Sequence, residues 1–220
     1  MEITLPAPVD TVWQAFRNPT IIRRWFGWDY EGLDEEIRVI FYDETVADEA
    51  GRTLQIGGHR FSLDDRGIET VVRVDAGSEA TYDEIEEGWL SFLQQLRFVL
   101  ARHPHDTRRS IYRNGETRSS PPAPAVELLG LDGIGDRGRY SVTTAVGDHL
   151  SGDVWFRSLR QLGLTVDQWG DGLLLVAQSP AGPGAASMFL CTYGRDLAVL
   201  TDLESRWATW WDGHFESGNV

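Results

Sequence analysis

The first 28 residues carry apolar positions in two different periods. Ile3 and Leu5 are separated by a polar neighbour, as in a half-buried strand. Pro6 and Pro8 end this strand, because proline cannot donate to a sheet ladder. Apolar residues then recur at the i, i+3, i+4 and i+7 spacing of an amphipathic helix: Val9, Val12, Trp13 and Phe16. The pattern predicts a strand, a turn and a helix that ends before Pro19.

A second apolar stripe predicts a short second helix, which Gly27 ends. The stripe consists of Ile21, Ile22, Trp25 and Phe26. A strand followed directly by two short helices is typical of a lid over a curved sheet. Because such a lid encloses a cavity, a cavity is the main functional clue in the chain.

The next segment predicts an antiparallel meander of short strands. The expected strands are residues 38–46, 52–56, 60–63 and 68–74, with turns at 48–51 and 64–67. The period then changes to that of a helix over residues 83–102. One face of this helix collects the apolar residues Ile85, Trp89, Phe92, Leu93, Leu96, Val99 and Leu100. Acidic residues open the helix, where they favour its dipole.

The second half of the chain predicts a second β-rich unit that ends in a helix. Asn114-Gly115 predicts a hairpin turn, and the Pro- and Ser-rich residues 119–125 predict a linker. Strands are expected at 140–146, 152–156, 162–166, 173–178 and 187–193, followed by a helix at about 196–215. We therefore expect an α+β protein with a domain at 1–118 and a second unit at 126–220.

Composition removes several classes of function. The formal net charge of −14 argues against nucleic acid or an anionic membrane surface as the partner. All 20 basic residues are arginine, which excludes a Schiff-base lysine and a P-loop lysine. Cys191 is the only cysteine, so no internal disulfide can form. No charged and apolar leader opens the chain and no apolar run approaches about 18 residues, so a soluble, cytoplasmic protein is expected.

Two groups of residues carry a resemblance to a known family. The first is residues 6–16, followed by Asn18, Pro19, Ile22, Trp25 and Phe26. The second is residues 86–89, followed by Phe92, Leu93 and Leu96. On these motifs, residues 1–105 resemble the SRPBCC (START-like, helix-grip) superfamily, with the branch named after the activator of the heat-shock-protein-90 ATPase as the closer match.

The resemblance implies a helix-grip fold, in which a curved antiparallel sheet holds a long C-terminal helix with a cavity between them. Members of the superfamily bind apolar small molecules, cyclise polyketides or act as chaperone cofactors. The second half resembles a C-terminal extension of some bacterial members, and a truncated helix-grip repeat is one interpretation of it. The separate N-terminal domain of eukaryotic chaperone activators has no counterpart here, which lowers the expectation of a co-chaperone.

Aromatic residues are the candidates for lining the expected pocket, since ligand pockets are mostly apolar with a few polar anchors. These candidates are Trp25, Phe26, Trp28, Tyr30, Phe41, Tyr82, Trp89 and Phe92. The alternative is that most of them pack the core. His59 joins the set if the strand that begins near residue 60 faces the cavity, whereas Glu69 is expected to point to water.

Other motifs are better explained without a site. Residues 133–138 match a dinucleotide pattern formally, but a strand follows them, so a loop is expected. His103 and His105 are expected to lie at a solvated helix end rather than to bind a metal. Cys191 sits in an apolar run and is expected to be inert. Neither a cofactor nor a catalytic constellation is expected.

Three functional hypotheses remain. The first is a non-catalytic protein that binds an apolar small molecule in the helix-grip cavity. The second is an enzyme of the cyclase or hydratase kind, with Tyr, His or acidic residues of that cavity as acid–base groups. The third is an interaction module, either a chaperone cofactor or a homodimer that pairs through an open sheet edge.

Overall fold

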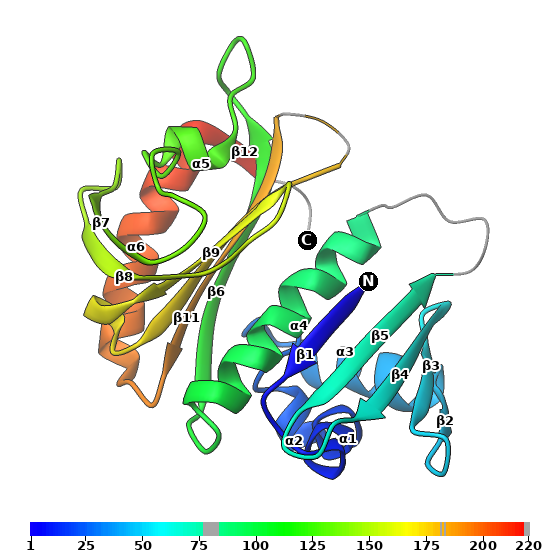
Figure 1. Ribbon diagram of the computed structural model, residues 1–220. Helices are drawn as coiled ribbons and strands as arrows, with labels where there is room; N and C mark the ends of the chain where they lie inside the picture. Colours follow the sequence, from blue (N-terminus) through cyan, green and yellow to red (C-terminus); the bar gives the residue numbers. More distant parts are fainter. Residues whose placement is uncertain (77–83, 181, 183, 218–220) are drawn as a thin grey trace. The chain divides into compact units, whose positions relative to one another are not determined.

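The chain divides into two compact units, residues Met1–Asp106 and Thr107–Val220 (Figure 1). The computed structural model describes residues 1–76, 84–180, 182 and 184–217. Each unit combines an antiparallel sheet with helices. The expected α+β class, with two β-rich units that each contain a long helix, is confirmed.

The first unit holds a five-stranded sheet in the order β1-β5-β4-β3-β2, in which every neighbouring pair is antiparallel. Its strands are β1 (Glu2–Leu5), β2 (Val46–Asp48), β3 (Thr53–Ile56), β4 (His59–Asp65) and β5 (Thr70–Ala76). Its α-helices are α1 (Val9–Arg17), α2 (Pro19–Ile22), α3 (Leu33–Arg38) and α4 (Glu84–Arg102). The long α4 follows the strands and packs against the sheet through its aromatic residues, as a helix-grip arrangement requires.

The opening strand and the first helix lie where the sequence predicts them, whereas α2 ends at Ile22, before the predicted end at Gly27. Asn18 ends α1 in an extended conformation, and its side-chain oxygen accepts a hydrogen bond from the Thr20 amide at 3.0 Å. This bond caps α2, which begins at Pro19, the helix position where proline is tolerated best. Gly27 has a φ of +60°, a conformation that favours glycine at the end of a helical segment.

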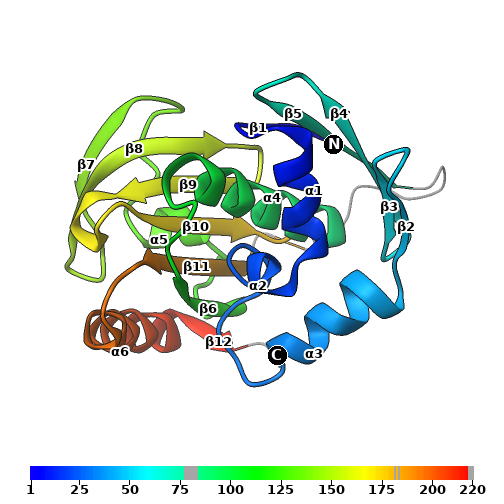
Figure 2. The ribbon, with the colours of Figure 1, turned by 90° about the horizontal axis from the view of Figure 1, so that it is seen from below.

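The predicted strand at residues 38–46 is wrong. Those residues form the end of α3, then a π-helix (Val39–Asp43), and only afterwards the short β2 (Figure 2). Arg17 of α1 donates to the Phe41 carbonyl at 2.8 Å, and the Tyr42 hydroxyl donates to the Arg17 carbonyl at 2.5 Å. These contacts hold the segment against α1 and direct Phe41 inward, so tertiary structure overrides the β propensity of its residues.

The second unit holds a seven-stranded antiparallel sheet in the order β12-β6-β11-β10-β9-β8-β7. Its strands are β6 (Arg108–Thr117), β7 (Arg139–Thr143), β8 (His149–Arg157), β9 (Gln161–Val166), β10 (Gly172–Gln178), β11 (Ala185–Tyr193) and β12 (Phe215–Ser217). The helical segments are α5 (Ala125–Leu128), the 3-10 turn η2 (Asp167–Trp169) and α6 (Leu197–His214).

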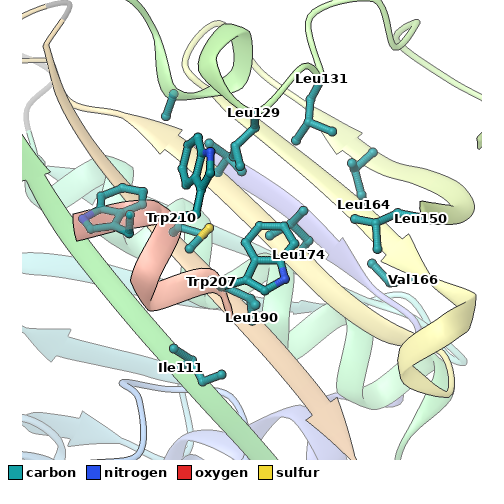
Figure 3. Close-up of a cluster of buried hydrophobic side chains, with 14 of the residues drawn as sticks. Ile111, Leu129, Leu131, Leu150, Leu164, Val166, Leu174, Leu190, Trp207 and Trp210 are labelled. Carbon is teal, nitrogen blue, oxygen red and sulfur yellow. The ribbon is translucent and has the colours of Figure 1, made fainter. Parts of the chain in front are cut away.

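The core of the second unit lies between one face of its sheet and α6 (Figure 3). Leu164, Leu174 and Leu190 come from three neighbouring strands and point to the same face, because each is paired across the sheet with the next. Trp207 and Trp210 of α6 lie over them. The apolar face predicted for this helix is therefore the buried one, except that Leu197 at its first turn is 66% exposed.

Strand β6 belongs to the second unit, although the sequence-based boundary at residue 118 assigns it to the first. It pairs with β11 over its whole length and with β12. Asn114 and Gly115, predicted as a hairpin turn, lie inside this strand. The predicted linker is also part of the second unit: Ser119 accepts a hydrogen bond from the Ala123 amide at 3.0 Å and donates one to the Pro121 carbonyl at 3.0 Å.

Gly115 allows β12 to approach β6 closely, so we predict that Gly115→Ala destabilises the second unit. A Cβ atom there would lie 2.3 Å from the backbone oxygen of Glu216. We expect a loss of about 1–3 kcal/mol in the free energy of unfolding and faster hydrogen exchange at residues 215–217. Gly133→Ala is the control, because a Cβ there meets nothing within 4 Å. Equal stability of the two variants would contradict this account of the strand pair.

Candidate functional site

Five of the predicted pocket residues form one aromatic cluster in the first unit: Trp25, Phe26, Phe41, Trp89 and Phe92. They come from the segment after α2, from the π-helix and from α4. The ring centre of Phe26 lies 4.9 Å from that of Phe41 and 4.7 Å from that of Phe92. Their separations and tilts are those of packed aromatic pairs.

Two further rings that the sequence did not single out complete this cluster. Phe61 of β4 lies 4.8 Å from Trp89, and Phe16 of α1 lies 5.2 Å from Trp25. The Trp25 indole donates a hydrogen bond to the Ala15 carbonyl at 3.0 Å, which satisfies its buried polar atom. The aromatic cluster thus links the lid helices, the sheet and α4. Alternation along β4, where Phe61 and Leu63 are buried, is the sequence pattern that could have identified Phe61.

Trp28 and Tyr30 form a further aromatic pair, with ring centres 5.4 Å apart. Tyr30 is 38% exposed, and its hydroxyl donates to Glu36 Oε2 at 2.7 Å. Partial burial and the Glu36 carboxylate raise the pKa of Tyr30 to about 12. Tyr30 therefore stays protonated near neutral pH and is engaged with a carboxylate at the surface.

His59 lies on the inward face of β4. The side chains of His59, Phe61 and Leu63 alternate with those of less buried neighbours, so the three share the face that carries the aromatic cluster. Ring atom Nδ1 of His59 lies 3.0 Å from the Gly57 carbonyl oxygen. Because a carbonyl only accepts, this contact favours the tautomer with the proton on Nδ1, in which Nε2 is an acceptor. No described residue hydrogen-bonds Nε2.

A polar stripe on α4 was missed by sequence reasoning. Glu87, Ser91, Gln94 and Gln95 are all buried, at spacings that place them on the helix face opposite Trp89 and Leu96. The Ser91 hydroxyl donates to the Glu87 carbonyl at 3.2 Å. A polar stripe at helical spacing is typical of a solvent-facing surface, so its burial could not be predicted from the spacing.

The remaining candidates are placed as follows. Tyr82 lies outside the described residues. Glu69 is exposed, as predicted, and residues 133–138 form a loop. Cys191 is buried and is not part of a disulfide. The described part of the chain contains no cluster of His, Cys, Asp and Glu able to hold a metal ion, and none of its helices is long and apolar enough to cross a membrane.

The helix end at His103 is confirmed, but this histidine is buried rather than solvated. Its Nδ1 lies 2.9 Å from Asp106 Oδ2, and its ring centre lies 5.3 Å from that of Phe98. Arg24 donates to the His103 carbonyl at 2.9 Å and to the Asp106 carbonyl at 3.0 Å. Arg24 thus satisfies two backbone carbonyl oxygens that follow the end of α4, so residues 103–106 have a structural role.

Comparison with known proteins returned similar solved structures only; no family model and no curated protein matches the chain. The di-domain ARO/CYC StfQ from the steffimycin biosynthetic pathway is 9% identical, with a TM-score of 0.37 over 92% of this chain and 86% of that chain. The di-domain ARO/CYC BexL from the BE-7585A biosynthetic pathway is 12% identical, with a TM-score of 0.34 over 100% of this chain and 98% of that chain.

DynU16, from the dynemicin biosynthetic locus, is 15% identical, with a TM-score of 0.29 over 96% of this chain and 93% of that chain. At these identities and TM-scores, the similarity assigns neither a family nor an activity to this chain.

The aromatic cluster predicts a large difference between two tryptophan variants of the first unit. Trp89→Ala removes a buried side chain that contacts Phe26 and Phe61, so we expect a loss of about 3–5 kcal/mol in unfolding free energy. Trp28→Ala, at a partly exposed position, should cost about 1 kcal/mol. Urea denaturation followed by circular dichroism measures both. Similar losses in the two variants would mean that Trp89 is not part of a packed interior.

Proposed function

We propose that the first unit binds an apolar, aromatic small molecule that carries a hydroxyl group. The observation that carries this proposal is His59, a buried ionisable side chain with an unengaged acceptor nitrogen on the face of the aromatic cluster. A hydroxyl of the ligand would donate to Nε2, while its ring system would pack among the aromatic side chains.

The affinity would come mainly from removing apolar ligand surface from water, at about 25 cal/mol per Å². Because the rings of the aromatic cluster contact one another, the ligand would have to separate some of them. Phe92 is the member of the cluster that is only partly buried. We infer that entry occurs on its side of the interior, where the fewest buried contacts are lost.

Binding is better supported than catalysis. A cyclase or hydratase needs an acid–base pair within reach of the ligand. Tyr30 is exposed and Glu69 lies in a surface turn, so His59 is the described candidate that faces the interior. Its hydrogen-bond partner is a carbonyl rather than a carboxylate. The chaperone-cofactor role, the closer family branch, a homodimer and a cytoplasmic location stay predictions.

Two probes of matched shape test the proposal. 2-Naphthol can donate a hydrogen bond to His59 Nε2, whereas 2-methoxynaphthalene cannot. We expect the wild-type protein to bind 2-naphthol about three- to tenfold more tightly, which corresponds to one hydrogen bond. His59→Leu should abolish this preference. Equilibrium dialysis with fluorescence detection measures both affinities, and native mass spectrometry of freshly purified protein would show a co-purifying ligand.

The control variant is His105→Leu, which removes an exposed histidine of the same unit. It should keep the preference for 2-naphthol. Circular dichroism establishes that His59→Leu remains folded. Equal affinity of the wild-type protein for the two probes, or the same preference in His59→Leu as in wild type, would refute the proposed role of His59.

A further inference from the structure

The second unit carries a surface groove of about 600 Å³, which is within the range of small-molecule sites. It runs between the first turns of α6, the start of β8 and η2. The groove is confined to the second unit and contains none of the residues of the aromatic cluster. An inference about it is therefore independent of the function proposed above.

The inner wall of the groove is apolar. Leu150, Trp169 and Leu203 line it, and each is almost completely buried in the core behind it. Val199 of α6 extends this apolar surface to the rim, where it is 41% exposed. The groove thus offers a hydrophobic strip against which the body of a small ligand can pack.

The charged side of the groove consists of Arg206 and two carboxylates that accept hydrogen bonds from it. Its Nε and Nη2 atoms donate to Asp202 Oδ2 at 3.1 and 2.9 Å, and its Nη1 atom donates to Asp148 Oδ1. The second oxygen of Asp148 accepts from the Trp207 indole at 2.8 Å. Although partial burial opposes it, the bonds and charges of Asp202 and Asp148 raise the pKa of the Arg206 guanidinium.

Two carboxylates therefore share one guanidinium, which leaves the groove with a net negative charge. Both oxygens of Asp148 are occupied, whereas Oδ1 of Asp202 accepts no hydrogen bond from the described residues, and this side chain is 70% exposed. The Arg206 guanidinium keeps two of its five N–H donors outside these bonds, but an anion that accepted from them would lie close to the carboxylates of Asp148 and Asp202. The charge balance favours a cation.

We propose that this groove binds a small amphipathic cation, with its apolar body against Leu150, Trp169 and Leu203 and its ammonium group at Asp202 Oδ1. His149, which also lines the groove, lies 3.4 Å from the hydroxyls of Ser141 and Thr143 and supplies no negative charge. The net charge of −14 on the whole chain acts in the same direction, because it attracts cations toward the surface.

A charge series on one scaffold tests the proposal: phenethylamine is a cation, 2-phenylethanol is neutral and phenylacetate is an anion at neutral pH. Isothermal titration calorimetry on the full chain should give decreasing affinity in that order. Asp202→Asn should weaken phenethylamine about two- to fivefold, as expected for a partly exposed ion pair. The same substitution should leave the affinity for 2-phenylethanol unchanged and increase the affinity for phenylacetate.

The matched control is Asp212→Asn, which removes the same charge from an exposed position of α6 outside the groove. It should leave the affinity for phenethylamine unchanged. Val199→Arg should weaken the binding of phenethylamine, since it places a positive charge at the rim of the groove. Tighter binding of phenylacetate than of phenethylamine by the wild-type protein, or equal losses in Asp202→Asn and Asp212→Asn, would overturn the proposal. 2-Naphthol binding should be the same in all four proteins, so this result is separable from the function proposed for the first unit.

Discussion

Both units depend on the same physical constraint: a long helix buries an aromatic stripe against one face of an antiparallel sheet. In α4 the stripe includes Trp89, which contacts Phe61 of the sheet. In α6 it includes Trp207 and Trp211, which belong to the core over β9, β10 and β11. Large aromatic side chains bury much apolar area each, so a few of them can hold a helix to a sheet. Short strands and irregular turns are tolerated around such a contact.

The same constraint determines where polar groups can be placed to contact a ligand. An interior packed with rings excludes water, so a polar atom inside it needs a partner or has a function. In the first unit, His59 lies on the aromatic face of the sheet, and no described residue hydrogen-bonds its Nε2 atom. In the second unit, one polar group is formed where the Trp207 indole donates to Asp148 and Arg206 joins Asp148 to Asp202.

Much of the fold could be predicted from sequence, because most elements follow a local period. The spacing of Trp89 and Leu96 identifies α4, and alternation identifies β4. The errors arise where a contact with a residue far away in the sequence determines the local conformation. Arg17 holds residues 39–43 in a π-helix, and pairing with β11, much later in the chain, places Asn114-Gly115 inside a strand. The groove in the second unit had no sequence pattern, since its charged residues are far apart in the chain.

The two buried histidines of the first unit differ in their hydrogen-bond partners and in the part of the fold that they face. His103 has a carboxylate partner, Asp106, but it lies at the end of α4, where Arg24 joins it in completing the helix terminus. His59 faces the aromatic interior, and its hydrogen-bond partner is the Gly57 carbonyl, which orients the ring. A general base needs both properties in one residue. Among the described residues of the first unit, the fold divides these two properties between His103 and His59, which is why we propose that the interior accepts a hydrogen bond from a ligand.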